Sequence, residues 1–220
     1  MFKRIIVIGD VHGCAKTLKN LIQIIQPTSD DWIIMLGDYF DRGPSSAEVF
    51  EYLQEMNDKY NCTFLKGNHE RMLVDAFWKG EKYLWYCNEG RITEDSFSKA
   101  GIPIGQAISW ASKLPLWIES EKYYFVHAGL PYGDPDQNDE EDMLWDRAHM
   151  QDEKRMTSKT VVFGHTPHAK PILTPNGNIC IDTGCVFNTE NFKGSLTAMI
   201  INAKDEEDCE FISVPYIDFN

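Results

Sequence analysis

Residues 5–25 read IIVIGDVHGCAKTLKNLIQII, and this stretch sets the pattern for the first third of the chain. The four apolar residues at its start form a continuous run that is typical of a buried strand. Gly9-Asp10 then interrupts the run. Apolar residues recur after it at helical spacing, at Leu18, Leu21, Ile22 and Ile25. The stretch therefore predicts a strand, a tight loop and a helix.

Two further units of the same kind follow. Residues 32–36 and 62–65 are strand-like, and each precedes a helix-like segment, at 45–60 and at 70–78. Strands that alternate with helices in this way pair in parallel and form α/β layers. In such folds the residues that carry chemistry lie at the carboxyl ends of the strands. The loops after these strands are therefore the expected place for a functional site.

The regular alternation ends near residue 79. Periodicity is weak over residues 79–114, with short helical candidates at 94–99 and 105–113, so we expect an inserted helical cap there. Residues 116–119 and 123–127 are strand-like, and an acidic loop at 134–142 leads to a short helix near 143–150. The remainder is rich in β-forming residues, with strand candidates at 160–163, 171–174, 179–181, 196–202 and 210–215.

These patterns together predict an α/β protein of the α+β layered type. We expect a central β-sandwich of two mixed sheets flanked by helices, with a small helical cap inserted at about 79–114. The α/β first half is expected to form one sheet and the β-rich second half the other. A length of 220 residues with 43% hydrophobic content fits a single domain over residues 1–220.

The charge of the chain restricts its partners. A formal net charge of −13 provides no basic excess that could release counterions from a nucleic acid or bind an anionic membrane, so neither partner is expected. The same charge would repel an anionic substrate, so local cations, metal ions among them, would have to attract one.

The cysteines and the first residues bear on localisation. Six cysteines are scattered without a C-x-x-C pair, which favours reduced thiols and a cytoplasmic protein. The apolar run near the start is far shorter than a membrane span, and neither a signal peptide nor a membrane helix is expected.

Six short motifs come where predicted strands end, and each combines a glycine with an oxygen or imidazole ligand. They are Gly9-Asp10-Val11-His12-Gly13, Gly37-Asp38-Tyr39-Phe40-Asp41-Arg42-Gly43, Gly67-Asn68-His69-Glu70, His127-Ala128-Gly129, Gly164-His165-Thr166 and Asp182-Thr183-Gly184. One such motif is weak, but four of the six histidines of the chain occur in this set. Imidazole and carboxylate together suit Mn, Fe, Zn and related ions.

In wording and order, these motifs resemble the metal-dependent phosphoprotein phosphatases (PPP), in their bacterial and phage-type form, within the calcineurin-like metallophosphoesterases. The resemblance spans residues 9–184. It implies one calcineurin-like metallophosphoesterase domain with a β-sandwich core. It also implies two divalent metal ions. Mn is the expected metal, and Fe, Zn or Ni are the alternatives.

The resemblance also implies a role for each matched residue. Asp10 and His12 would hold the first metal, Asn68, His127 and His165 the second, and Asp38 would bridge the two. A hydroxide that bridges the metals would attack phosphorus directly, without a phosphoenzyme.

Four further residues would handle the substrate. His69 resembles the general acid of the family and Asp41 the carboxylate that orients it. Arg42 matches the arginine that binds the phosphate, and Arg147 is placed like a second phosphate-binding arginine. A surface arginine paired with Asp146 or Glu141 is the alternative for Arg147.

The leading hypothesis is a serine/threonine protein phosphatase, active also on tyrosine, with a phosphoprotein, a phosphopeptide or a small phosphoester as substrate. Its competitor is symmetrical hydrolysis of dinucleoside tetraphosphates, such as diadenosine tetraphosphate, and the short chain favours the phosphatase. An inactive binding scaffold is disfavoured because every matched position is filled, and a nuclease because of the acidic charge. The regulatory subunits of eukaryotic relatives are not expected, because the chain lacks their long C-terminal segment.

Two groups of residues are expected to be structural. Trp78, Trp85, Trp110 and Trp117 are predicted mainly to pack as the small core of the insertion. His149 and His168 are expected to have ordinary polar roles.

Overall fold

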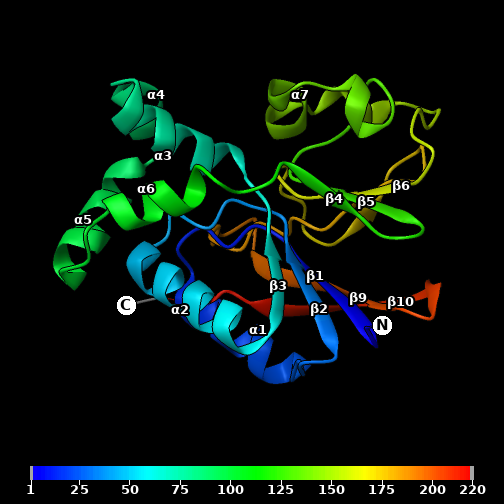
Figure 1. The fold of residues 1–220 in the computed structure, drawn as a ribbon, viewed down its shortest axis with the longest axis horizontal. Coiled ribbons are helices and arrows are strands. Elements are labelled where there is room, and N and C mark those ends of the chain that lie inside the picture. Colours follow the sequence, from blue (N-terminus) through cyan, green and yellow to red (C-terminus); the bar gives the residue numbers. More distant parts are fainter. Residues whose placement is uncertain (1, 219–220) are drawn as a thin grey trace.

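The computed structural model describes residues 2–218, which form two five-stranded sheets covered by helices (Figure 1). The strand order is β10-β9-β1-β2-β3 in the first sheet and β4-β5-β6-β8-β7 in the second. Both sheets are mixed, so the predicted α/β fold with two mixed sheets is confirmed.

The first sheet joins strands from both ends of the chain. Its parallel strands are β1 (Arg4–Ile8), β2 (Asp31–Met35) and β3 (Asn61–Phe64), and its antiparallel strands are β9 (Ser195–Asn202) and β10 (Asp205–Pro215). The prediction that each half of the chain forms its own sheet was therefore wrong. The apolar run of β9 is buried and pairs along the whole of β1, which covers an edge that the first half alone would leave open.

The second sheet contains β4 (Trp117–Glu119), β5 (Tyr123–Val126), β6 (Thr160–Phe163), β7 (Ile172–Leu173) and β8 (Ile179–Cys180). β5, β6 and β8 run parallel, whereas β4 and β7 are antiparallel edge strands. Apolar side chains from the two sheets meet in one buried cluster, among them Val7, Ile34, Leu36, Phe125, Val162 and Met199. This cluster is the core of the sandwich.

Helices cover the outer faces of both sheets. On the first sheet, α1 (Ala15–Ile25) and α2 (Ser46–Lys59) bury Leu18 and Leu53 against the strands. Beside the second sheet lie η1 (Pro135–Gln137), α7 (Glu140–Trp145) and η2 (Ala148–Gln151). The predicted helix at 143–150 is thus two short pieces, of which the first begins earlier than predicted. The cause is Asp139, whose carboxylate accepts the Asp142 N–H at 2.9 Å and caps α7 inside the expected acidic loop.

The inserted segment is helical, as predicted, and it continues from α3 (Asn68–Trp78). It contains α4 (Lys82–Cys87), α5 (Gly90–Ala100) and α6 (Gly105–Ala111), of which α4 was not predicted. Trp85 is fully buried, but Trp78 is 66% exposed and Trp117 is 37% exposed, so the tryptophans do not form one core. Within residues 2–218 we find no helix with the length and apolar character that a membrane crossing would need.

Candidate metal centre

Nine of the ten predicted site residues lie in one contiguous group at the ends of five strands. Asp10 and His12 follow β1, and Asp38, Asp41 and Arg42 follow β2. Asn68 and His69 open α3 after β3, His127 follows β5, and His165 follows β6. Both sheets therefore contribute side chains to the same site, as expected where carboxyl ends of parallel strands meet.

The backbone at this group adopts a conformation that side chains rarely allow. Seven non-glycine residues among the described ones have a positive φ, and five of them are predicted site residues: His12, Asp38, Asp41, Arg42 and His165. Left-handed backbone costs free energy in non-glycine residues, and it persists where surrounding contacts impose it. Its concentration here marks the group as a functional site.

Lone pairs from four side chains converge on one side of the site. The Asn68 Oδ1 atom lies 2.9 Å from His127 Nε2 and 3.1 Å from His165 Nδ1, and His127 Nε2 lies 3.4 Å from Asp38 Oδ1. The His127 Nδ1–H donates to the Leu36 carbonyl at 2.9 Å, so Nε2 is the ring nitrogen that faces the site and would hold a cation once its proton has left. Turning the Asn68 amide would offer hydrogens to these atoms, but a cation satisfies all of them in the orientation observed. This donor set fits a divalent metal ion.

A second cluster shares Asp38 with the first. Ligand atoms of His12, Asp38 and His69 lie within 4.8 Å of one another, as do those of Asp38, His127 and His165. The His12 Nδ1–H donates to a backbone carbonyl at 2.9 Å, which leaves its Nε2 lone pair 3.6 Å from Asp38 Oδ2. One carboxylate thus faces both clusters, which is the arrangement expected of a bridging ligand.

Asp10 lies beside these clusters without belonging to either. Its carboxylate accepts the His165 backbone N–H at 3.3 and 3.1 Å. A Cβ at Gly164 would overlap Asp10, so only glycine permits this close approach. Burial, reinforced by the charge of Asp182, raises the pKa of Asp10 well above its usual range.

Burial and mutual charge set the protonation of the other ligands. Burial disfavours charge on His127, but the Asp38 carboxylate raises the pKa of His127 to about 9. Burial, together with the charge of His127, lowers the pKa of His165 to about 2. Burial opposes ionisation of Asp38, yet the imidazoles around it, His127 first, hold the pKa of Asp38 well below its usual range. In the metal-free protein a proton on His127 therefore supplies the positive charge beside Asp38 that a metal ion would otherwise supply.

His69 and Asp41 form a pair that solvent does not reach. His69 Nδ1 donates to Asp41 Oδ2 at 2.7 Å, and both side chains are fully buried. His69 Nε2 has no hydrogen-bond partner and lies 3.9 Å from Asp38 Oδ2, so it points at the shared carboxylate of the second cluster. An imidazole oriented by a carboxylate, with its other nitrogen directed into a site, is suited to proton transfer.

The two arginines differ in position. Arg42 is half-buried, with Nη1 2.8 Å from His12 Nε2 and its guanidinium 5.6 Å above the ring of Phe187. Arg147 is exposed, although its charge helps to depress the pKa of His165. The alternative pairing with Asp146 is not observed, since that carboxylate instead accepts from the His149 ring at 2.6 Å.

Sequence reasoning assigned no role to four residues that support the site. Glu70 accepts backbone N–H groups of Asp38, Tyr39 and Gly67 at 2.8, 2.9 and 3.0 Å, and burial raises the pKa of Glu70 to about 7. Asp182 is also buried, and burial raises its pKa to about 6. Both belong to recognised motifs, so a signal was present.

The other two, Trp85 and Thr93, come from the insertion, and both donate to Asp41. No motif marks either of them.

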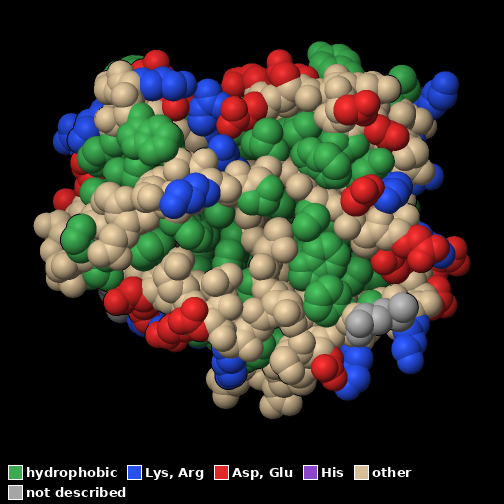
Figure 2. Space-filling model, viewed as in Figure 1, with side chains coloured by type: hydrophobic (Ala, Val, Ile, Leu, Met, Phe, Trp, Pro, Cys, Tyr) green, Lys and Arg blue, Asp and Glu red, His purple; other side chains and the backbone are tan. Residues whose placement is uncertain are grey.

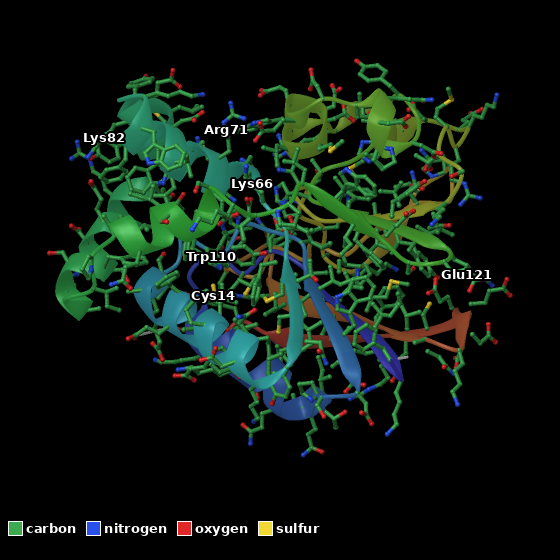
Figure 3. All side chains as sticks on the ribbon, viewed as in Figure 1. Cys14, Lys66, Arg71, Lys82, Trp110 and Glu121 are labelled. Carbon is green, nitrogen blue, oxygen red and sulfur yellow. The ribbon has the colours of Figure 1, made fainter. Side chains whose placement is uncertain are left out.

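A hollow of about 230 Å³ lies beside the site, between α3, α4 and α7. Trp145, which lines the hollow, also places its ring edge against His165, with ring centroids 6.0 Å apart. Arg71 and Lys66 lie opposite α7 (Figure 3). Arg71 Nη1 lies 2.7 Å and Lys66 Nζ 3.4 Å from the carboxylate oxygens of Glu140 in α7. Trp145 thus separates the hollow from His165, and the lining of the hollow carries charges of both signs.

Comparisons with known proteins agree with this geometry. Residues 3–193 match the family described as calcineurin-like phosphoesterase. Serine/threonine-protein phosphatase 1 of Salmonella typhimurium is 29% identical over 198 residues, which cover 84% of this chain and 88% of the relative. An asymmetrical bis(5'-nucleosyl)-tetraphosphatase of Oceanobacillus iheyensis is 28% identical, with 96% of this chain and 92% of the relative covered.

The crystal structure of a cold-active protein tyrosine phosphatase shares the fold, with a TM-score of 0.67, 16% identity, and coverage of 96% of this chain and 79% of that one. Because a tetraphosphatase matches over nearly its full length, the shortness of the chain does not separate the two substrate hypotheses. The sequence match over residues 3–193 and the two shared-ligand clusters lead to one conclusion: the chain belongs to the calcineurin-like phosphoesterases and is a metallophosphoesterase.

Proposed function

We propose that this protein is a metal-dependent phosphomonoester hydrolase that acts as a serine/threonine protein phosphatase, with phosphotyrosine as a further substrate. The observation that carries the proposal is the position of Asp38 between two ligand clusters, beside an unpartnered nitrogen of His69. The similarity to a serine/threonine-protein phosphatase over most of both chains supports the substrate class.

Two divalent cations are the proposed cofactors, Mn first and Fe, Zn or Ni as alternatives. Asp10 and His12 would hold one, Asn68, His127 and His165 would hold the other, and Asp38 would be shared between them. The convergence of Asn68 Oδ1, the ring nitrogens of His127 and His165, and the Asp38 carboxylate supports the second of these sites. When bound, two such cations lower the pKa of a coordinated water and neutralise charge on the phosphoryl oxygens.

The residues of the chain perform the remaining steps. His69, protonated at Nε2 and held through Nδ1 by Asp41, donates the proton that the leaving alkoxide requires. Arg42 presents its planar guanidinium to two phosphoryl oxygens, and Phe187 limits the positions that this group can take. Arg147 approaches the phosphate from the loop after α7 and adds positive charge at the entrance.

The substrate beyond the phosphate lies in the hollow between α3, α4 and α7. Its lining combines Leu84 and Trp145 with charges of both signs, a composition that suits a peptide better than a uniformly anionic ligand. Next to it the surface carries exposed apolar side chains over α3 and α4 (Figure 2), namely Phe77, Trp78, Tyr83 and Leu84. These could contact the flanking residues of a phosphopeptide.

Two broader proposals accompany this function. The six cysteines are free, which supports a reducing, cytoplasmic location. One buried cluster joins the first sheet, its covering helices and the insertion, including Trp85 and Phe97, which supports a single domain. That domain is proposed for residues 1–220, of which 1, 219 and 220 lie outside the described part.

The alternative is hydrolysis of dinucleoside tetraphosphates. It is favoured by a specific observation, the 28% identity to an asymmetrical tetraphosphatase over 96% of this chain. The symmetrical enzyme of Coxiella burnetii matches a smaller part, 57% of this chain and 41% of the relative. The exposed Trp78 and Tyr83 could stack on a base, so the two functions compete for the same surface.

A comparison of three substrates tests the proposal. The purified protein is supplied with Mn, and turnover of an aryl phosphate, a phosphoserine peptide and diadenosine tetraphosphate is measured. Metal-dependent turnover of the peptide, abolished in Asp38→Asn, is the expected result. A preference for the dinucleotide by orders of magnitude would establish the alternative, and no turnover of any of the three would refute both.

A further inference from the structure

The Asp41 carboxylate receives more donors than the His69 pair needs. Besides His69, the Trp85 indole N–H lies 3.0 and 2.9 Å from its two oxygens, and the Thr93 hydroxyl donates to Oδ1 at 2.6 Å. All four side chains are fully buried. Trp85 belongs to α4 and Thr93 to α5, so two helices of the insertion reach the same carboxylate.

Thr93 also holds the backbone of Asp41. Its hydroxyl oxygen accepts the Asp41 N–H at 2.9 Å while its hydrogen goes to the carboxylate. Asp41 has a φ of 67°, a left-handed conformation that is uncommon outside glycine. The Thr93 hydroxyl, with a longer contact of 3.3 Å from Ser46 Oγ to the same N–H, therefore holds the backbone of Asp41 as well as its side chain.

The two helices that supply these donors are tied to each other at the surface. Lys82 donates to Glu94 at 2.9 Å, and the Tyr86 hydroxyl donates to the same carboxylate at 2.6 Å. Figure 3 shows Lys82 on α4, at the outer edge of the molecule. Gly90 opens α5 directly against Trp85, and a Cβ there would overlap the indole. The insertion is thus built so that Trp85 has one position.

We propose that the insertion is part of the catalytic apparatus, with Trp85 and Thr93 as positioning residues that fix Asp41 and, through it, the proton-donating imidazole of His69. Neither residue belongs to the two clusters of possible metal ligands found among residues 2–218. A carboxylate with three donors cannot rotate away from His69 without leaving a buried donor unpaired, which is costly. The insertion therefore sets the orientation of the acid as well as the wall of the hollow.

This inference rests on the proposed function, and leaving-group dependence tests it separately. An alkoxide leaving group needs a proton, whereas a phenolate such as p-nitrophenolate departs without one. We expect Trp85→Phe and Thr93→Val each to lower kcat for a phosphoserine peptide about tenfold or more. kcat for p-nitrophenyl phosphate should fall less than about threefold, and KM and bound Mn should not change.

Conservative and indirect variants sharpen the test. Thr93→Ser keeps the hydroxyl and should restore peptide turnover to within about twofold of the wild type. Gly90→Ala displaces the indole without altering any donor and should reproduce the Trp85→Phe pattern. Trp117→Phe, at a partly exposed tryptophan of β4, controls for loss of an indole, and Leu21→Val, at a buried residue of α1, controls for lost stability.

The outcomes separate the two proposals. If the wild-type protein loaded with Mn turns over neither substrate, the proposed function fails. If the wild type is active but Trp85→Phe and Thr93→Val lower both substrates equally, or neither, the function stands and the positioning role is refuted. Selective loss on the alkyl ester, with rescue by Thr93→Ser and a melting temperature no lower than that of Leu21→Val, establishes the role.

Discussion

His69 is the residue whose replacement discriminates best between substrates. Its Nε2 is buried without a partner and its Nδ1 is held by Asp41, so His69→Asn removes the acid and leaves the neighbouring ligands in place. We expect kcat for a phosphoserine peptide to fall about 10²–10⁴-fold, and kcat for an aryl phosphate to fall much less. Steady-state kinetics on both substrates measures this, with bound metal quantified by elemental analysis. Equal losses on the two substrates would remove His69 from the role of acid.

Phe187 is expected to act on the substrate through Arg42. The guanidinium lies 5.6 Å from the ring, a contact worth about 0.5–1 kcal/mol when partly exposed. Phe187→Leu should therefore raise KM for a phosphoester about two- to fivefold while kcat stays nearly constant. Phe192→Leu is the matched control, because that ring packs against Phe187 in the same loop. A rise in KM that is equal in both variants would indicate a general loosening of the loop.

For individual residues, the sequence predicted much of the site but not the residues that hold the site in place. The proposed ligands Asp10 and His165 stand beside glycines at strand ends, and that pattern is local, so it can be recognised directly in the sequence. Trp85 and Thr93 contact Asp41 from positions 44 and 52 residues away, with no periodicity or motif to link them. The hydrogen bonds of Trp85 could therefore not be predicted from the sequence, and Trp85 was expected only to pack in the core of the insertion.

Among the elements, α1 depends on a residue from the far end of the chain. Its own N-cap, Cys14, makes no side-chain cap bond. The carboxylate of Asp218 instead accepts the N–H groups of Lys16 and Thr17 at 2.7 and 2.9 Å. Asp218→Ala should lower the free energy of unfolding by about 1–2 kcal/mol, the usual cost of a lost cap. Urea denaturation measures it.

Asp205→Ala is the control for the Asp218 prediction, since it removes an exposed carboxylate of β10 and should change the free energy of unfolding by less than about 0.5 kcal/mol. An unchanged midpoint for Asp218→Ala would mean that the α1 N-terminus is satisfied by water.

The errors at the level of elements have a common cause. Helical and strand periodicities are local, so the elements from β1 to α3 were placed nearly to the residue. The pairing of β9 with β1 is a long-range choice between sheets, and nothing in residues 195–202 names a partner. α4 was missed because a helix of six residues is too short to display an amphipathic period.

For the whole molecule, the buried charges of the site predict how stability depends on pH. The folded state raises the pKa of His127 to about 9, of Glu70 to about 7 and of Asp182 to about 6. Each of these groups binds its proton more tightly in the folded protein than in the unfolded chain, where its pKa is the ordinary one. The folded state therefore loses this stabilisation as the pH rises through the raised pKa. The metal-free protein should therefore melt at a lower temperature at pH 8.5 than at pH 6.5.

Metal binding should reverse this trend. A cation needs the Nε2 lone pair of His127 and must displace its proton, so the increase in melting temperature on adding Mn should be larger at pH 8.5 than at pH 6.5. Differential scanning fluorimetry measures both effects. His168→Asn, a half-buried histidine outside the centre, should leave the trend intact. Stabilisation by Mn that is independent of pH would contradict the protonation assigned to His127.

Because β9 completes the first sheet, the protein can finish folding only after β9 has been translated. Residues 4–8 leave the ribosome long before their neighbour on one side, Ser195–Asn202, and long before the Asp218 cap, which is 202 residues beyond Lys16. Until then the nascent chain carries an open β edge beside an unfinished ligand set. If translation stopped late, the released polypeptide would thus contain nearly every catalytic group but would not be an active enzyme. Chaperones and proteases would be expected to bind it.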